Sequence, residues 1–356
     1  MDSDLPGVRQ TRYRLLGLQS VRHDDGIIVR RGSVRFFVRG PVMGELLDLI
    51  VARSAEGHGI RLDELKAAID PAKHSALTAL IETLRSERLI VPVEGDAADW
   101  PERREDIFYW NHKADGRVVA ENVAKVEVAV FGVNHIALPL LGNLRSVGFR
   151  RLTLVDHPGL RNLDFYDDGG LRSEIAGALS IRPQAFDEWT AAGGKSDCHV
   201  VCSDFGGLIL MRDWNRTAVA SNIVFYPIVL QDEVASLGPL VVPGEGPCFE
   251  CLWLRQSANL DEDARQRADE SHAFFGQHAT GFLQPMARIA ADIAAVDLLK
   301  YFSRALPGGR AGRVIEVDLM TPSLRTRNLL KAPRCPVCAL TIGPPEGAAK
   351  PGAAAP

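Results

Sequence analysis

The first ninety or so residues alternate between short apolar runs and helical repeats, in an order that predicts a small separate domain. Two β-rich runs, residues 26–30 and 33–38, flank the turn Arg31-Gly32. Strands followed by helices and a closing strand indicate a winged helix-turn-helix domain, which we place at residues 1–95. The helical stretches and the closing strand are residues 42–52, 62–69, 76–84 and 89–93.

A different pattern begins near residue 126. An apolar strand at 126–132 ends in glycine, an apolar-faced helix covers 136–147, and a second strand at 151–156 ends in an acid. This alternation predicts an α/β fold with a mostly parallel, Rossmann-like sheet over residues 126–342. Later elements of the same domain are strands at 197–204, 223–230 and 313–319 and an alanine-rich helix at 285–302.

Composition narrows the class of protein. The chain has 356 residues and a formal net charge of -4, which gives no general footprint for nucleic acid. No signal peptide and no apolar run of transmembrane length is present, so we expect no nucleic-acid partner, no membrane partner and a cytoplasmic protein. The polar stretch 96–125 is expected to be a linker, and the Pro-, Gly- and Ala-rich stretch 343–356 a disordered tail.

The cysteines carry the strongest chemical signal. Cys248 and Cys251 form one CxxC pair and Cys335 and Cys338 another, each among turn residues that suit tight loops. Two such pairs predict a tetrahedral structural zinc site that ties the end of the chain to the body; disulfides or a redox pair are the alternatives. The other two, Cys198 and Cys202, lie in an apolar stretch and are expected to be buried, reduced thiols, as in the cytoplasm.

The turn after the first strand of the second domain reads Gly-Val-Asn-His-Ile-Ala from Gly132 to Ala137. A phosphate-binding loop needs several glycines so that backbone N–H groups can approach the phosphates, and only the first is present here. Asp156 ends the second strand, where an acid would meet a ribose hydroxyl. We therefore expect a Rossmann-like scaffold without productive triphosphate binding, and no ATP cofactor.

At this point the residues resemble a known family. The unit 130–162, the strand ending at Asp204, the phrase 238–251 and the distant second CxxC look like the ThiF-like, ubiquitin-activating-enzyme superfamily, over residues 126–340. The phrase before Cys248 is similar to that in leader-peptide-binding partners of YcaO cyclodehydratases, which serve thiazole/oxazole-modified ribosomal peptide (bacteriocin-type) biosynthesis. The N-terminal domain resembles the PqqD-like element that recognises precursor peptides in this family.

The resemblance also assigns site residues. Active members of the superfamily adenylate a carboxylate with a glycine loop, a Lys, an Arg and two acids. Here Ser173 and residues 164–165 stand where the two cations are expected, and each missing cation removes charge-assisted bonds to phosphate. The resemblance therefore implies a degenerate nucleotide site and no catalytic residues. The residues of this degenerate nucleotide site are Gly132, Asn134, Asp156, Asn162 and Asp204.

The function that the resemblance implies is capture of a leader peptide and its presentation to a separate YcaO cyclodehydratase, which this chain would activate. The leader would add a strand to the edge at residues 33–38. Arg35→Glu or Val34→Pro is expected to weaken leader affinity. Relatives commonly form homodimers through the sheet domain. For the groove residues on the third helical stretch, ordinary core packing is the alternative. The candidate peptide-binding residues are Arg30, Val34, Arg35, Phe37, Leu77, Ile81 and Arg85, with Leu84 beside them.

Two other functions stay open at the level of sequence. The first is an active, ATP-dependent adenylating enzyme of the ThiF class that acts on a peptide or carrier-protein carboxylate; ATP–pyrophosphate exchange would reveal it. The second is a winged-helix DNA-binding regulator with a zinc-stabilised effector domain. The third helical stretch, with Lys73, His74, Glu82 and Arg85, is not a basic stripe and argues against the second.

Overall fold

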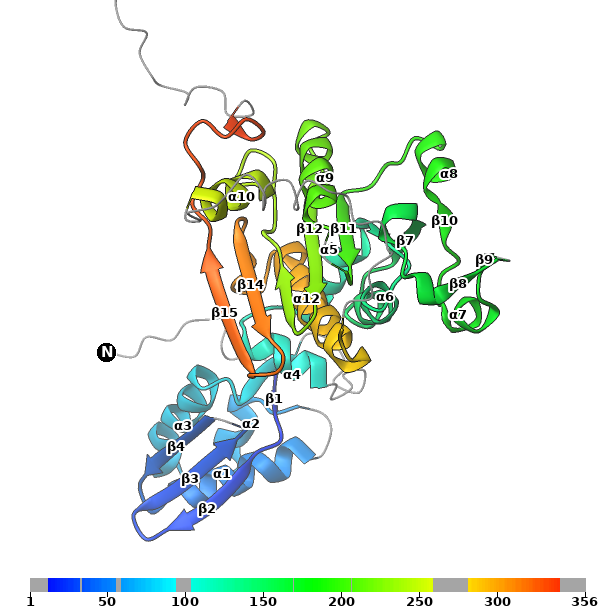
Figure 1. Cartoon of the computed structure of the whole chain (residues 1–356). Helices are drawn as coiled ribbons and strands as arrows, with labels where there is room; N and C mark the ends of the chain where they lie inside the picture. Colours follow the sequence, from blue (N-terminus) through cyan, green and yellow to red (C-terminus); the bar gives the residue numbers. More distant parts are fainter. Residues whose placement is uncertain are drawn as a thin grey trace, which may run out of the picture. The chain divides into compact units, whose positions relative to one another are not determined.

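The chain forms two compact units, residues 1–112 and 113–356. The computed structural model describes residues 12–32, 34–55, 59–93, 104–168, 170–205, 207–258 and 281–339. The expected disordered tail, 343–356, lies outside the described residues. Both units are shown in Figure 1, where elements are labelled if there is room.

The first unit combines a three-stranded antiparallel sheet with helices (Figure 1). The two predicted β-rich runs are β3 and β4, the predicted helices are α1 to α3, and the closing strand is β5, which pairs with β1. The sheet order is β2-β3-β4. The bounds are β1 (Arg12–Leu15), β2 (Gln19–His23), β3 (Gly26–Arg31), β4 (Val34–Arg39), β5 (Ile90–Val93), α1 (Met43–Ala55), α2 (Leu62–Ala67), a 3-10 turn (Pro71–Lys73), α3 (His74–Ser86) and α4 (Arg104–Asn111).

The core of the first unit forms because the helices bury one face each and the sheet buries one of its two faces. Ile27 and Val29 of β3 point inward and are fully buried, whereas Ile28 and Arg30 point to the other face, as the two-residue period of a strand requires. Side chains of α1 and α3 at helical spacing complete this core: Leu46, Leu47, Ile50, Leu77, Leu80, Ile81 and Leu84.

The second unit is built on an eight-stranded sheet in the order β10-β7-β6-β11-β12-β13-β14-β15. The strands from β10 to β12 pair in parallel, and those from β12 to β15 pair antiparallel. The strand bounds are β6 (Glu127–Phe131), β7 (Arg151–Asp156), β8 (Tyr166–Asp167), β9 (Gly170–Leu171), β10 (Gln184–Ala185), β11 (Cys198–Ser203), β12 (Val224–Gln231), β13 (Val234–Leu237), β14 (Arg313–Asp318) and β15 (Ser323–Asn328).

Helices cover this sheet, so the mixed α/β class with a mostly parallel sheet is confirmed (Figure 1). The small domain precedes this unit in the sequence. The alanine-rich helix predicted from the sequence is α12. It packs on α6 and α5, and its alanines are buried inside this unit. No helix in the described part of the chain is long and apolar enough to cross a membrane. The helix bounds are α5 (Gly116–Ala124), α6 (Ala137–Ser146), α7 (Ser173–Ala178), α8 (Phe186–Ala191), α9 (Leu208–Ala220), α10 (Phe249–Ala258) and α12 (Gln284–Ser303), with short 3-10 turns at Pro158–Leu160 and Leu163–Phe165.

The stretch expected to be an irregular linker, 96–125, contains two helices, so that expectation is wrong for its later part. Helix α4 belongs to the first unit, where the Trp110 indole Nε1 donates to the Arg88 carbonyl at 3.0 Å. Helix α5 belongs to the second unit and buries Val119 and Val123, which stand four residues apart on one face. Polar residues separate the partly or fully buried side chains of α4 and α5, so the sequence shows no clear helical repeat of apolar residues there.

Candidate functional site

The four cysteines of the two CxxC pairs converge in the second unit. All are buried, and their sulfur atoms lie within 4.8 Å of one another. The Cys248–Cys335 and Cys251–Cys338 sulfur pairs are 3.7 and 3.5 Å apart. Zinc–sulfur bonds of about 2.3 Å in a tetrahedron place the sulfurs about 3.8 Å apart, so the cluster fits zinc; a disulfide would need about 2.05 Å.

Local structure explains how the first pair is aimed. The sequence suggested a loop, but Cys248 immediately precedes α10 and Cys251 lies in its first turn, with its N–H bonded to the Cys248 carbonyl at 3.0 Å. A hydrogen bond from Cys248 lowers the pKa of the Cys251 thiol to about 4, and the same bond raises the pKa of Cys248. Thiolate character at a helix N-terminus suits a metal ligand.

The loop after β6 lies at the point where the strand order reverses, between β7 on one side and β11 on the other. Ligands of doubly wound sheets bind at such a place. Gly132 has φ of 108°, and a side chain there would meet the Cys202 carbonyl oxygen at 2.7 Å. This glycine is therefore required by the backbone itself, whatever binds nearby.

Asn134 fills the space at the start of α6. Its side chain is fully buried, and its Oδ1 accepts from the N–H groups of Ile136 and Ala137 at 3.1 and 3.0 Å. Its Nδ2 donates to the carbonyls of Leu160 and Cys202 at 3.1 and 2.8 Å. All four hydrogen-bonding positions of this amide are thus used inside the protein.

The two acids of the predicted nucleotide site are also engaged by protein groups. The Asp204 Oδ2 accepts from the His135 N–H at 3.1 Å and from the Asn162 amide at 2.8 Å. Burial raises the pKa of Asp204, and these two bonds oppose the shift. Asp156 receives two hydrogen bonds from the Arg161 guanidinium, at 2.7 and 2.9 Å.

The solvent-facing side of the small sheet carries three of the seven predicted peptide-binding residues, Arg30, Arg35 and Phe37. Phe37 is 41 % exposed and lies in register with Ile28, which in turn faces Val21. Arg35 lies directly opposite Arg30, and both are exposed. Nine residues make up this surface, which we call the outer face: Gln19, Val21, His23, Gly26, Ile28, Arg30, Arg35, Phe37 and Arg39.

Strand β4 is an edge strand, since no other described strand pairs with it beyond β3. The Gly40 N–H bonds to the Asp25 carbonyl at 2.8 Å, which fixes the phase of the ladder. Hydrogen-bonded pairs alternate along an antiparallel ladder, so Val34, Phe36 and Val38 turn their backbone groups toward β3. The backbone groups of Arg35, Phe37 and Arg39 point to the open edge.

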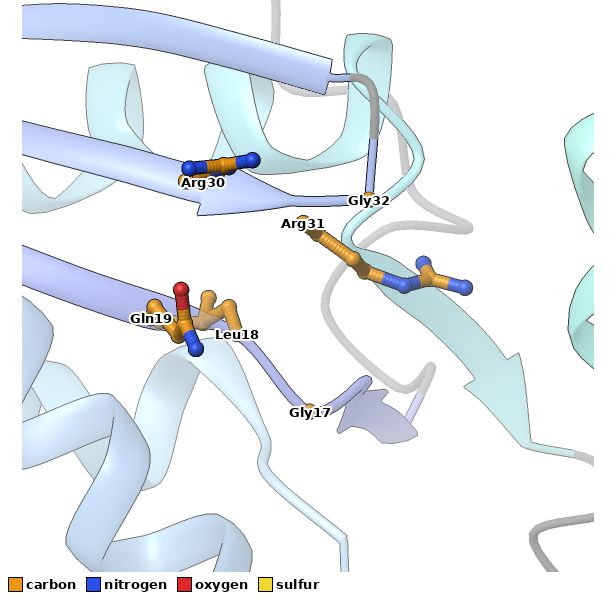
Figure 2. A pocket seen from close by; sticks show the side chains of 6 residues that line it. All are labelled: Gly17, Leu18, Gln19, Arg30, Arg31 and Gly32. Carbon is orange, nitrogen blue, oxygen red and sulfur yellow. The ribbon is translucent and has the colours of Figure 1, made fainter.

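A pocket of about 600 Å³ continues the outer face at one end. Figure 2 shows Arg30 on β3 with Gln19 on the neighbouring strand, and the Arg31 side chain pointing away from both. The Arg31 guanidinium donates to the Arg88 carbonyl at 3.2 Å, while its Nη2 is buried without a partner in the described part of the chain. Burial lowers the pKa of Arg31. The lining residues are Gly17, Leu18, Gln19, Arg30, Arg31 and Gly32.

Three predicted groove residues are placed elsewhere. Leu77 and Leu84 are fully buried and Ile81 is 5 % exposed, all within the core of the first unit. They cannot line an open groove, because the helical face that carries them is the face that packs on the sheet. Arg85 lies on the exposed side of α3, and Val34 contributes its backbone to β3 rather than to the open edge.

Comparisons with solved structures find the same fold. The E. coli MccB structure with ATP is 19% identical, with a TM-score of 0.65, covering 92% of this chain and 99% of that one. The microcin C7 biosynthetic enzyme MccB in complex with N-formylated MccA has 18% identity and a TM-score of 0.64, with the same coverage. A heterocyclase in complex with substrate and cofactor has 17% identity and a TM-score of 0.58, covering 92% of this chain and 40% of that one. No protein-family model and no curated protein sequence matches the chain.

Some residues of these sites escaped sequence reasoning. Arg161, which holds Asp156, carries no motif, although a cation five residues after a strand-ending acid is a usable signal. Strand β2 went unnoticed because all five of its residues are exposed and show no apolar alternation. The partners of Asn134 come from residues 26 and 68 positions away, which no local pattern encodes.

Proposed function

We propose that this chain is the leader-binding subunit of a peptide-modifying complex. It would bind the leader of a ribosomally made precursor as an added strand on β4, in the manner of PqqD-like domains. It would then present the core of the precursor to a separate YcaO cyclodehydratase, which it activates to form thiazolines and oxazolines. The observation that carries this proposal is the open β4 edge: Arg35, Phe37 and Arg39 have exposed side chains, and their backbone groups pair with no other described strand.

The fold likeness supports a peptide partner. The MccB neighbour has been solved with the peptide MccA, and the heterocyclase neighbour with a substrate. Both neighbours are other proteins, and this chain shares their fold at low identity. We extend the peptide partner to this chain because the open edge of β4 offers a place for an extended peptide.

The second unit would act as a scaffold without catalysis. A phosphate at the N-terminus of α6 would need the N–H groups of His135, Ile136 and Ala137, and all three already bond to protein oxygens. This supports the absence of an ATP cofactor. The four cysteines would hold one structural zinc ion, because four thiolates leave no position for a substrate. A homodimer through this unit, as the resemblance implies, is checked by light scattering of the full chain.

The proposal is tested first with labelled short peptides encoded beside the gene for this chain. Each is titrated by fluorescence anisotropy against the full chain and against Arg35→Pro, whose lost N–H faces the open edge. We expect Arg35→Pro to abolish binding and Arg35→Ala to retain part of it, because only proline removes the backbone donor.

The matched control is Ser20→Pro on the opposite edge of the same sheet. Backbone groups alternate in direction along β3 as well, so those of Ser20 on β2 point away from the sheet. Ser20→Pro should bind peptide as the wild type does. Equal binding by Arg35→Pro and wild type would contradict the placement on β4.

The second part of the test is reconstitution with a YcaO enzyme encoded nearby. Ring formation removes one water per cyclised residue, so mass spectrometry counts the rings. We expect rings only when the YcaO enzyme, ATP and this chain are all present, and none with Arg35→Pro. Full activity of the YcaO enzyme alone would contradict the presenting role.

The competing function is adenylation of a peptide or carrier-protein carboxylate. Two observations favour it: Asp156 and Asp204 stand at the ends of β7 and β11, and the MccB neighbour has been solved with ATP. ATP–pyrophosphate exchange with the same peptides separates the two functions. We expect no exchange above background, and peptide-dependent exchange would establish the competing function.

A further inference from the structure

The outer face of the small sheet has an unusual balance of charge. Its nine positions include three arginines and no carboxylate. Arg30 and Arg35 stand directly opposite each other in a non-hydrogen-bonded pair, where cross-strand side chains approach most closely. Like charges in that position are destabilising. Neither these two arginines nor Arg39 forms an ion pair with any described residue.

Some cations elsewhere in the same unit are paired, although the exposed Arg12 and Arg85 also form no ion pair with a described residue. Arg22 pairs with Asp48, Lys73 with Glu45 at 2.7 Å, and Arg61 with Asp63 at 2.5 Å. What distinguishes the outer face is that three arginines without an ion pair to a described residue lie together on it, with no carboxylate on the same face. Such a surface is suited to an anionic partner, since a complementary charge would remove the repulsion between Arg30 and Arg35.

The geometry of β4 defines the shape of that partner. Arg35, Phe37 and Arg39 share two properties: their side chains point to the outer face and their backbone groups point to the open edge. A strand added antiparallel to β4 would therefore place three alternate residues directly opposite them, with side chains on the same face. On the other face of β4, the side chains of Phe36 and Val38 pack against the core of the first unit.

From these two observations we propose that the peptide recognised by β4 carries the pattern acidic-x-apolar-x-acidic. The apolar side chain lies opposite Phe37 and packs beside Ile28, and the acids lie opposite Arg35, with Arg30 next to it, and Arg39. The pattern reads the same in both directions, so it does not depend on the direction of the peptide. This inference rests on the proposed function, because it describes the ligand of the same edge.

A polyanion such as DNA is the other ligand that arginines could attract. The outer face favours a peptide, because Phe37 lies between the arginines at strand spacing and the open edge offers backbone donors and acceptors. The net charge of -4 also opposes binding of a polyanion. The test below therefore includes DNA, and DNA binding to the outer face would contradict the inference.

The test is a selection of random short peptides displayed on phage against the full-length protein. The same library is selected against the double variant Arg35→Glu/Arg39→Glu. We expect the wild type to enrich Asp or Glu at two positions four residues apart, with a large apolar residue midway. The double variant should enrich Lys or Arg at the same two positions, a reversal that a merely unfolded protein could not produce.

Titration of one enriched peptide measures how much the acidic residues contribute to the binding affinity. Replacing both acids by lysine, or using the double variant, should weaken binding about tenfold at low salt, as expected for two exposed ion pairs. Arg325→Glu, an exposed arginine on the edge strand β15 of the other unit, changes the net charge equally per residue and should leave affinity unchanged.

The outcomes separate the inference from the function on which it rests. Peptides that bind at the β4 edge without the acidic pattern, or that bind the double variant equally well, overturn the inference and leave peptide binding in place. A selection that enriches nothing overturns both. A DNA duplex that binds the outer face and displaces the enriched peptide overturns the inference in favour of a polyanion site.

Discussion

At the N-terminus of α6, three consecutive backbone N–H groups bond to side chains of the protein itself. Along the outer edge of β4, by contrast, the backbone groups of Arg35, Phe37 and Arg39 pair with no other described strand. The first place lies where doubly wound folds bind nucleotides, and the second lies on a small domain at the other end of the sequence. A place that satisfies its own polar groups gains stability and has nothing left to offer a ligand. A place that leaves them open carries a cost that a ligand can remove.

The same contrast holds for charge. Around the α6 terminus, Asp156 is held by Arg161 and Asp204 by an amide and a backbone N–H. On the outer face, Arg30 and Arg35 repel each other. We infer that the two units divide the work, with stability in the sheet unit and recognition in the small unit.

The largest expected effect concerns the cysteine cluster, which would hold the sheet unit closed. Removing zinc with a chelator, or changing Cys338→Ser, should cost the second unit about 5 kcal/mol or more, because metal binding and folding are coupled in such sites. Metal analysis should find about one zinc per chain before treatment, from four ligands per ion. Hydrogen exchange measured at increasing denaturant concentration should show that backbone amides lose protection in the second unit alone.

The control for that experiment is Cys198→Ala. Cys198 is buried in β11 outside the cluster, so this variant should keep its zinc and lose only the packing of one sulfur. Wild-type protein that contains no zinc after metal-replete preparation would sink the assignment.

The next largest effect concerns Asn134. Replacing it by alanine removes four buried hydrogen bonds and leaves their partners unsatisfied, so we expect a loss of about 2–4 kcal/mol in the free energy of unfolding. Asn143→Ala, which removes an exposed bond to Asp292, is the matched control and should cost little. Thermal shift with ATP sharpens the comparison: ATP should leave the wild-type melting temperature unchanged, and a clear rise would show that the α6 terminus is not closed.

Some features of the fold could be predicted from the sequence and others could not. The turn Arg31-Gly32, the helical repeats and the strand ends at Gly132 and Asp156 were predictable, because each rests on local period or on a turn residue. The cysteine cluster was predictable because CxxC spacing carries chemistry with it. These signals concern residues that interact with near neighbours or that gather in one cluster of metal-ligand type.

The details that decide function depend on contacts across the fold. That Leu77 and Leu84 are core residues follows from which face of α3 packs on the sheet, and a helical repeat does not reveal this. That Asn134 occupies the α6 terminus follows from carbonyls contributed by Leu160 and Cys202. The outward direction of the Arg35 backbone required the phase of the β3–β4 ladder, which the Gly40 bond supplies.

A pH-dependent effect of intermediate size is expected for His199 in the sheet unit. Burial lowers the pKa of His199 to about 4, and neither ring nitrogen has a hydrogen-bond partner among the described residues. A depressed histidine pKa favours the neutral folded state, so stability is complete above pH 6.5 and is lost as pH falls from there toward 4. The whole window corresponds to about 3 kcal/mol.

The check compares denaturation of wild type and His199→Leu at pH 7 and pH 5. The wild type should lose more stability between the two values than the variant does, while both keep their zinc at pH 7. His157 contacts the same ring cluster and its pKa is also lowered by burial, so part of the slope will remain in the variant. Parallel curves would contradict the assignment of this slope to His199.

The smallest expected effect tests whether the open edge of β4 is costly. Arg35→Thr removes the repulsion with Arg30 and places a good strand former on the edge, so the small unit should gain about 0.5 kcal/mol of stability. The gain should shrink in high salt, because salt screens the repulsion between exposed charges. Arg325→Thr on β15 changes the net charge by the same amount and gives the reference. If Arg35→Thr stabilises the small unit while weakening peptide binding, the arginine pair is retained for recognition; if it destabilises the unit, the pair belongs to the architecture of the sheet.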